Sequence, residues 1–254
     1  MIKRLLKQNL SNSSKRKLRN HVNDFKAVFF CGNLNKLGKI YGTDKIGGHF
    51  YTPHYMTHLK KFRLKKINLL EIGVGGYKNP LIGGQSLRMW KKYFPFGRIF
   101  SLDIYDKSSL QENRIKIFKG SQVDKDFLEG VSDYIGEINI IIDDGSHINE
   151  HVIESFNILF PKLKDGGVYI IEDTQTSYWE DFGGDSKDLK NPKTMMNYFK
   201  NLTDSLNNQE FIFPNYKQTY FDKKIISIHF YHNLIFIYKG NNNEKSNMVV
   251  NNQR

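Results

Sequence analysis

Two pairs of acidic residues are the side chains best placed to do chemistry in this sequence. Asp143-Asp144 directly follows the apolar run 138–142, and Glu172-Asp173 directly follows the apolar run 168–171. Bringing four carboxylates together is costly unless a cation neutralises them. Oxygen ligands suit a hard divalent ion such as Mg²⁺ or Mn²⁺. The pattern therefore predicts that Asp143 faces a cofactor and that Asp144, Glu172 and Asp173 bind the metal.

A histidine follows the first acidic pair closely. His147 lies three residues after Asp144, at the predicted start of the next helix, where its imidazole can reach a metal-bound hydroxyl. Imidazole titrates near neutral pH, so His147 is the predicted general base. Two other interpretations stay open. The acids and the histidine can be helix caps, and the segment 147–151 matches the H-x-x-E-H pattern of inverted zinc peptidases.

A glycine-rich turn and further polar residues end the remaining apolar runs. Glycines in the turn 71–76 let the backbone approach a nucleotide-like ligand. Lys78 stands where a dinucleotide fingerprint requires its third glycine. Asp103 is placed to accept hydrogen bonds from ribose hydroxyls, although an ordinary strand-to-helix turn remains the alternative. The predicted cofactor-binding residues are Glu71, Gly73, Gly75, Ser86, Asp103, Gln122 and Asp143.

These residues can meet only if parallel strands end at one edge of a sheet. Short apolar runs alternate with amphipathic segments, a pattern that predicts an α/β fold with a mostly parallel, doubly wound sheet covered on both faces. The last run, 224–238, contains the turn-prone pair His232-Asn233 and predicts an antiparallel C-terminal hairpin at a sheet edge. The other predicted strands are 67–72, 98–104, 115–118, 138–143 and 167–172, and the predicted helices are 86–93, 124–128 and 148–160.

Composition limits the class of protein. The chain has 254 residues, of which 39% are hydrophobic, and a formal charge of +12 that favours anionic partners. A single cysteine, Cys31, excludes an intramolecular disulfide framework. No apolar run reaches the length of a membrane span, and Lys7 interrupts the only signal-like segment. We expect a cytoplasmic protein without a transmembrane span.

The charge is concentrated at the start of the chain. Seven bases between Lys3 and Arg19 predict a basic helical extension over 1–48, which is a solvated helix or makes peripheral contact with a membrane. The predicted catalytic domain covers 49–240. A polar tail over 241–254 is predicted to be disordered.

Several of these motifs together resemble a known family. The segments LEIGVGG, SLDIY, GSQVD, IIDDGSH and IIEDTQTSYW, with GTDKIGGHFYTPHY upstream, are similar to the macrolide-sugar O-methyltransferases of the mycinamicin and macrocin type over about 39–240. The combination IDDGSH and IEDTxTSYW is specific, whereas LEIGVGG is shared by many methyltransferases. The resemblance implies a Rossmann-like class I fold, S-adenosylmethionine (AdoMet) as cofactor and a requirement for Mg²⁺.

The resemblance also implies roles for individual residues. The AdoMet contacts of the family fall on Glu71, Gly73, Gly75, Asp103 and the Gln122 turn. Its metal ligands fall on Asp144, Glu172 and Asp173, and its base falls on His147.

We therefore predict metal-dependent transfer of a methyl group from AdoMet to a sugar hydroxyl. The positive charge leads us to expect a phosphorylated acceptor, a nucleotide- or lipid-linked sugar for capsule or lipopolysaccharide. The alternative is a catechol-type or antibiotic small-molecule O-methyltransferase. A nucleic-acid methyltransferase ranks lower. The six prolines never adjoin, so the Pro-Pro-aromatic motif of amino-methylating DNA enzymes is absent, and no proline precedes Cys31, so the nucleophile of cytosine-C5 enzymes is absent too. A non-catalytic AdoMet-fold binding protein also ranks lower. We expect a homo-oligomer and no nucleic-acid partner.

Overall fold

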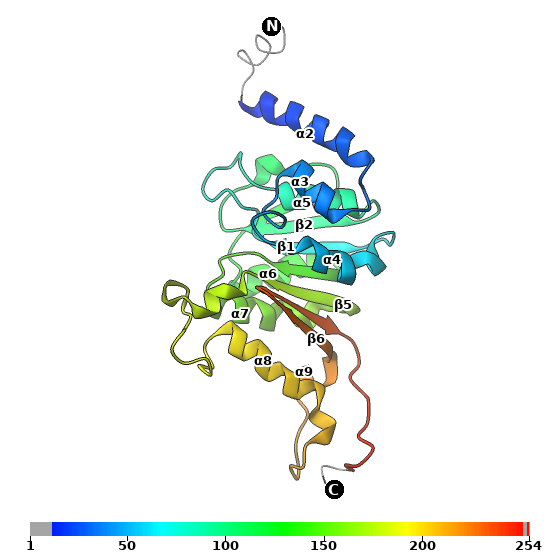
Figure 1. The fold of residues 1–254 in the computed structure, drawn as a ribbon, viewed down its shortest axis with the longest axis vertical. Helices are drawn as coiled ribbons and strands as arrows, with labels where there is room; N and C mark the ends of the chain where they lie inside the picture. Colours follow the sequence, from blue (N-terminus) through cyan, green and yellow to red (C-terminus); the bar gives the residue numbers. More distant parts are fainter. Residues whose placement is uncertain (1–11, 251–252, 254) are drawn as a thin grey trace. The chain divides into compact units, whose positions relative to one another are not determined.

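The computed structural model describes residues 12–250 and 253, so the predicted basic residues Lys3, Arg4 and Lys7 lie outside the described part. Between residues 68 and 172, helices or a short 3₁₀ turn separate each strand from the next (Figure 1). The helices are α2 (Asn12–Val28), α3 (Leu34–Tyr41), α4 (Thr52–Leu59), α5 (Gln85–Tyr93), α6 (Lys125–Ile135), α7 (Asn149–Leu159), α8 (Met195–Leu206) and α9 (Tyr220–Lys224). The strands are β1 (Asn68–Ile72), β2 (Arg98–Asp103), β3 (Ile115–Lys119), β4 (Ile138–Asp143), β5 (Leu163–Glu172), β6 (Ile225–Tyr231) and β7 (Leu234–Lys239). Among the described residues, no helix is both long and apolar enough to cross a bilayer.

The seven strands form one sheet in the order β3-β2-β1-β4-β5-β7-β6. β4 pairs in parallel with β1 and with β5, whereas β7 runs antiparallel to β5 and to β6. The predicted mostly parallel sheet with an antiparallel C-terminal hairpin is confirmed. The strand order reverses between β1 and β4, and in open α/β sheets ligands bind beyond the carboxyl ends of the strands at such a reversal.

The chain divides into two compact units. The first contains residues 12–67, 74–101 and 105–119 of the described chain, and the second contains 68–73, 102–104 and 120–250. In the first unit, Trp90 of α5 is fully buried and packs edge-to-face on Tyr55 of α4, with ring centroids 4.9 Å apart. Arg88 of α5 pairs with Asp24 of α2 at 2.9 Å, which fixes α2 to this core.

The second unit holds the strands that carry most of the predicted chemistry. The apolar residues of β4, β5 and β7 are almost entirely buried. Phe156 of α7 packs edge-to-face on Tyr169 of β5 and on Phe199 of α8, each at 5.1 Å, and stacks on Phe221 of α9 at 5.5 Å. These aromatic contacts hold the helices against β5 and make the strand ends a firm base for the site.

The start of the predicted C-terminal tail makes hydrogen bonds with two helices, and the disorder of the tail stays a prediction. Asn242 donates from Nδ2 to the carbonyl oxygens of Ser205 and Asp222, at 3.1 and 2.9 Å. Lys224 donates to Asn241 Oδ1 at 2.7 Å. The first residues of the tail therefore bind α8 and α9, because amide side chains capture carbonyls that the helix ends leave without an intrahelical partner.

Gly73 allows the chain after β1 to lie close to the chain after β4. Gly73 has a φ of +95°, and a Cβ at this position would overlap the carbonyl oxygen of Asp144. The backbone nitrogen of Gly73 donates to Leu102 at 2.8 Å, and that of Asp144 donates to Ile72 at 3.0 Å. Glycine is therefore required here both by the left-handed backbone and by the close approach of the next strand.

We predict that Gly73→Ala destabilises the protein by about 3 kcal/mol, since overpacking adds to left-handed strain. Gly183→Ala is the matched control. Gly183 is also left-handed, with a φ of +72°, but nothing lies within 4 Å of its added Cβ, so only about 1 kcal/mol is expected. Urea unfolding measures both values, and equal losses in the two variants would contradict the packing argument.

Candidate functional site

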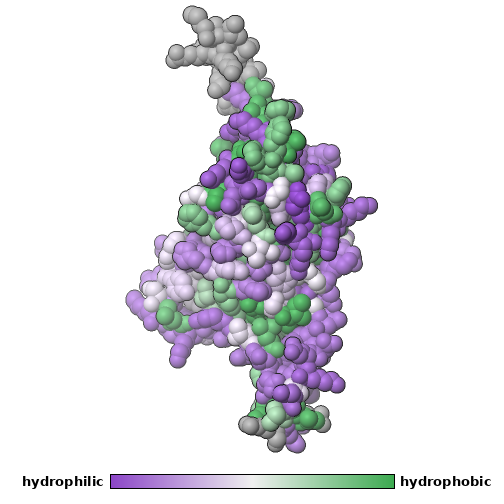
Figure 2. Space-filling view, turned by 45° about the vertical axis from the view of Figure 1, so that its right-hand side comes forward, coloured by the Kyte–Doolittle hydropathy of each residue, from purple (hydrophilic) through white to green (hydrophobic). Residues whose placement is uncertain are grey.

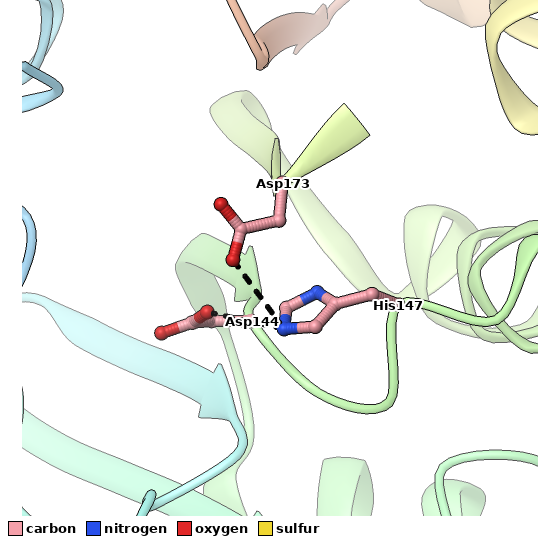
Figure 3. A group of neighbouring side chains, drawn as sticks. All are labelled: Asp144, His147 and Asp173. Carbon is pink, nitrogen blue, oxygen red and sulfur yellow. Dashed lines mark ion pairs between the residues drawn. The ribbon is translucent and has the colours of Figure 1, made fainter. Parts of the chain in front are cut away.

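Asp144, His147 and Asp173 converge beyond the ends of β4 and β5 (Figure 3). His147 Nε2 lies 3.5 Å from Asp173 Oδ2 and 3.9 Å from Asp144 Oδ1. Within the described residues, this is the one group of three side chains whose ligand atoms, all within 4.8 Å of one another, are close enough to hold a metal ion. All three side chains are partly exposed, so a small molecule can reach them.

The parallel register of the strands brings the two carboxylates together. Asp143, the last residue of β4, is level with Ile171 of β5, so the chain leaves both strands at nearly the same height. Asp144 and Asp173 are therefore neighbours although 29 positions separate them. The prediction that these two acids meet at one sheet edge agrees with the geometry.

Two residues of the cluster have a backbone conformation that residues other than glycine rarely adopt. His147 has a φ of +57° and Asp173 a φ of +55°, both in the left-handed region. Each costs about 1–2 kcal/mol for a residue other than glycine. Such conformations persist only where surrounding contacts hold them.

Thr176 supplies those contacts to both residues. Its Oγ1 lies 2.8 Å from the carbonyl oxygen of His147 and 3.1 Å from that of Asp173, and its single hydroxyl proton is shared between the two oxygens. The Thr176 side chain is buried, so water does not compete for these bonds. One hydroxyl thus ties together the turns that carry two of the three clustered side chains.

Asn149 fixes the segment that carries Thr176. From the first turn of α7, its Nδ2 donates to the carbonyl oxygens of Thr176 and Phe182, at 3.0 and 2.9 Å. Its Oδ1 accepts a bond from the backbone nitrogen of Met195 at 2.6 Å. The buried amide therefore joins α7, the loop after β5 and the start of α8. Neither Asn149 nor Thr176 was predicted as a site residue from the sequence.

Asp143 has its partners inside the protein. Its Oδ2 accepts a hydrogen bond from Ser155 Oγ at 2.6 Å, and its Oδ1 accepts one from Gln122 Nε2 at 3.3 Å. Burial raises the pKa of Asp143 to about 6, although the bond from Ser155 opposes that rise. Both oxygens have protein donors, so the expected contact of Asp143 with a cofactor stays a prediction.

Gln122 supports the loop that bears Asp144 and His147. Its Oε1 accepts a bond from the backbone nitrogen of Ser146 at 2.8 Å, while its Nε2 faces Asp143. The side chain is buried and lies against Gly145, where a Cβ would overlap it. Gln122 was predicted to bind a cofactor, and that role stays a prediction beside the structural one seen here.

The remaining predicted residues occupy two different settings. In the second unit, Glu71 and Glu172 are buried at the ends of β1 and β5, and Asp103 is half-buried at the end of β2. Glu172 is not part of the three-residue cluster, which contains His147 instead. Its role as a metal ligand stays a prediction.

The other two predicted cofactor residues lie in the first unit. Gly75 is left-handed, with a φ of +76° and open space around its absent side chain. Ser86 is the second residue of α5, which begins directly after the left-handed Gly84. The loop between them is anchored by the buried Lys107, whose Nζ donates to the carbonyl oxygens of Asn79 and Ile82.

The alternatives left open by the sequence fit this geometry poorly. The N-cap of α7 is Ile148, so neither Asp144 nor His147 caps that helix, and Asp173 makes no side-chain cap before the 3₁₀ turn 174–178. His147 precedes α7 rather than beginning it. His151 contacts Ser146 Oγ at 3.0 Å and is not in the cluster, so the zinc-peptidase pattern does not form a site.

Known proteins resemble this chain closely over much of its length, although no protein-family model matches it. Mycinamicin VI 2''-O-methyltransferase from Micromonospora griseorubida is 46% identical over 220 residues, which cover 84% of this chain and 55% of the relative. Demethylmacrocin O-methyltransferase from Streptomyces fradiae is 47% identical over 214 residues, covering 84% and 54%. The chain thus spans about half the length of these relatives.

A solved structure gives the same result for the fold. The mycinamycin-pathway methyltransferase MycE, crystallised with Mg, SAH and mycinamycin VI, matches with a TM-score of 0.81 and 45% identity over 84% of this chain and 55% of that one. The predicted Rossmann-like class I methyltransferase fold is confirmed.

We predict that Thr176→Val lowers the affinity of the cluster for Mn²⁺ by about tenfold, because the turns of His147 and Asp173 lose their shared donor. Thr176→Ser keeps the hydroxyl and serves as the matched control, with near-normal affinity. Isothermal titration calorimetry with Mn²⁺ measures both. Equal affinity in the valine and serine variants would show that the hydroxyl does not position the cluster.

Proposed function

Close homologues of this chain are the sugar O-methyltransferases of the mycinamicin and macrocin type, and from this premise we propose that it transfers a methyl group from AdoMet to a sugar hydroxyl with the help of a divalent cation. The observation that carries the proposal is the convergence of Asp144, His147 and Asp173 beyond β4 and β5, with His147 and Asp173 on left-handed turns. The Mg and SAH bound by MycE support the same cofactors here.

The residues present fit a divalent cation. Two carboxylates and an imidazole lie with their ligand atoms within 4.8 Å of one another, and Thr176 holds the turns of His147 and Asp173. Asp144 and Asp173 would hold the ion, and the adjacent Glu172 is the third proposed ligand. A cation bound there would stabilise negative charge on a sugar oxygen as its proton leaves.

His147 is the proposed acceptor of that proton. Its Nε2 lies 3.5 Å from Asp173 Oδ2 and 3.9 Å from Asp144 Oδ1, beside the oxygen atoms that would hold the ion. Its Nδ1 is buried and has no hydrogen-bond partner among the described residues.

The polar residues at the ends of β1 and β2 are the proposed AdoMet contacts. Asp103 would accept hydrogen bonds from the ribose hydroxyls, and Glu71 and Gly73 would line the cofactor at the end of β1. The roles of Gly75, whose backbone is left-handed and open, and of Ser86, both in the first unit, stay predictions from the sequence. Holding the methyl donor and the hydroxyl in line supplies much of the acceleration in such a transfer.

Exposed aromatic residues directly after the site suit a sugar acceptor. Tyr178 and Trp179 follow the loop held by Asn149, and their side chains are 40% and 50% exposed. Trp179 packs on Phe182 with ring centroids 5.9 Å apart, which leaves part of its surface open. The apolar face of a sugar can pack on such a ring.

The class of acceptor is the point where our expectation changes. The substrates named for the relatives, mycinamicin VI, demethylmacrocin and a rhamnosyl tetracenomycin, are glycosylated antibiotics rather than capsule or lipopolysaccharide precursors. They favour the alternative of an antibiotic acceptor over our prediction of a phosphorylated sugar for capsule or lipopolysaccharide. We therefore propose a sugar attached to a small apolar molecule as the acceptor, without a required phosphate.

The test is methyl transfer measured by mass spectrometry on three acceptors. We expect activity on a glycosylated macrolide, less on a nucleotide sugar and none on a catechol. Activity should disappear with EDTA and return with Mg²⁺ or Mn²⁺. Full activity in a metal-stripped sample would contradict the metal requirement. Activity on the catechol alone would contradict a sugar as the acceptor.

His147→Ala separates the possible roles of the histidine. As general base, His147 contributes about 10²–10⁴-fold, so the variant should retain AdoMet and Mn²⁺ binding but lose most of its kcat. Calorimetry and initial rates between pH 6 and 9 measure these quantities. Loss of Mn²⁺ binding would instead make His147 a metal ligand. A near-normal kcat would show that another group takes the proton.

A further inference from the structure

The helix α2 packs on its unit through a polar face, whereas an ordinary surface helix buries its apolar face. The side that faces the rest of the first unit is polar: Arg16 donates to the carbonyl oxygen of Ser109 at 3.0 Å, and Asp24 pairs with Arg88 at 2.9 Å and accepts a bond from Tyr41 at 2.8 Å. Ala27 is the one apolar residue of the described α2 positions that is buried. Polar contacts, rather than burial of an apolar face, therefore hold α2 in place.

The opposite side of α2 is an exposed apolar stripe. Leu18, Val22 and Phe25 recur at the spacing of one helix face, and Phe29 continues the stripe just beyond the helix end. Their exposed fractions are 56%, 46%, 69% and 71%. Figure 2 shows apolar surface over α2. A contiguous exposed stripe of this kind marks an interaction surface.

Basic side chains flank the stripe on both sides. Lys15, Arg19 and Lys26 lie along one edge, and Lys17 lies along the other. No ion pair between described residues engages these four bases. The only acid of the helix, Asp24, is turned inward to Arg88. The exposed face of α2 is therefore apolar at its centre, with bases and no acid along its edges.

We propose that this face of α2 lies on an anionic phospholipid surface, with the apolar stripe inserted at the headgroup level and the flanking bases against lipid phosphates. An amphipathic helix with bases beside a Phe/Leu stripe has the chemistry of interfacial helices. A second copy of this chain fits less well, because two identical stripes would bring two rows of bases together without an acid between them. The proposal is independent of the reaction proposed above.

Vesicle sedimentation of the full chain tests the proposal. With vesicles of phosphatidylglycerol and phosphatidylcholine in equal parts we expect co-sedimentation, and with phosphatidylcholine alone we expect little. High salt should release the protein, since headgroup charges are screened. Absence of binding to the anionic vesicles, or equal binding to both kinds, overturns the proposal.

Variants tie the binding to α2. Phe25→Ser should weaken partitioning about tenfold, and the changes Lys15→Gln, Arg19→Gln and Lys26→Gln should weaken it about fivefold each. Phe96→Ser is the matched control, because Phe96 is 60% exposed in the same unit but outside α2. Its binding should match that of the unchanged protein.

The changed side chains are exposed, so we expect an unchanged thermal midpoint in every variant, and Leu18→Ser provides a second apolar variant if one fails to fold. Normal vesicle binding by Phe25→Ser and Leu18→Ser contradicts the proposal. So does a dimer, seen by analytical ultracentrifugation without lipid, that Phe25→Ser dissociates while no vesicles bind. That result would show that the stripe is the interface between two copies of the chain.

Discussion

The hydrogen bond that the Thr176 hydroxyl shares between the carbonyl oxygens of His147 and Asp173 is the interaction on which the site depends most. Both residues have left-handed backbones, which an ordinary side chain adopts only at a cost of about 1–2 kcal/mol. If either turn relaxed to a right-handed conformation, its side chain would leave the cluster. The strain at the site is therefore compensated by a buried donor that serves both turns.

Two further polar groups keep that donor and the neighbouring loop in place. Asn149 joins the Thr176 segment to α7 and α8, and Gln122 joins the loop after β4 to Asp143. Both amides are buried, so the alternative to these bonds is an unsatisfied polar group in the interior. The aromatic cluster around Phe156 fixes the helices against β5 beneath them. Positioning thus comes from elements outside the cluster, as a precise site requires.

The sequence predicted the sheet well because each strand is a short apolar run that stops at an acid or a glycine. It predicted the meeting of Asp144 and Asp173 because parallel strands end at a common edge. The helix predicted at 124–128 extends to Ile135. The helix α8 was not predicted at all, because many polar residues surround its buried apolar residues, such as Phe199 and Leu202, and obscure the helical spacing. Thr176 and Asn149 escaped prediction because a loop threonine and a helix-start asparagine usually form caps or turns, and only tertiary contacts reveal their partners.

The central claim is that Asp144 and Asp173 form a divalent cation site beside His147. Anomalous diffraction at the manganese edge, from crystals grown with Mn²⁺ and S-adenosylhomocysteine, locates such an ion directly. Our account predicts one peak at about 2.1 Å from a carboxylate oxygen of each aspartate, with His147 close by. No peak between these carboxylates, or a single peak elsewhere on the protein, would contradict it.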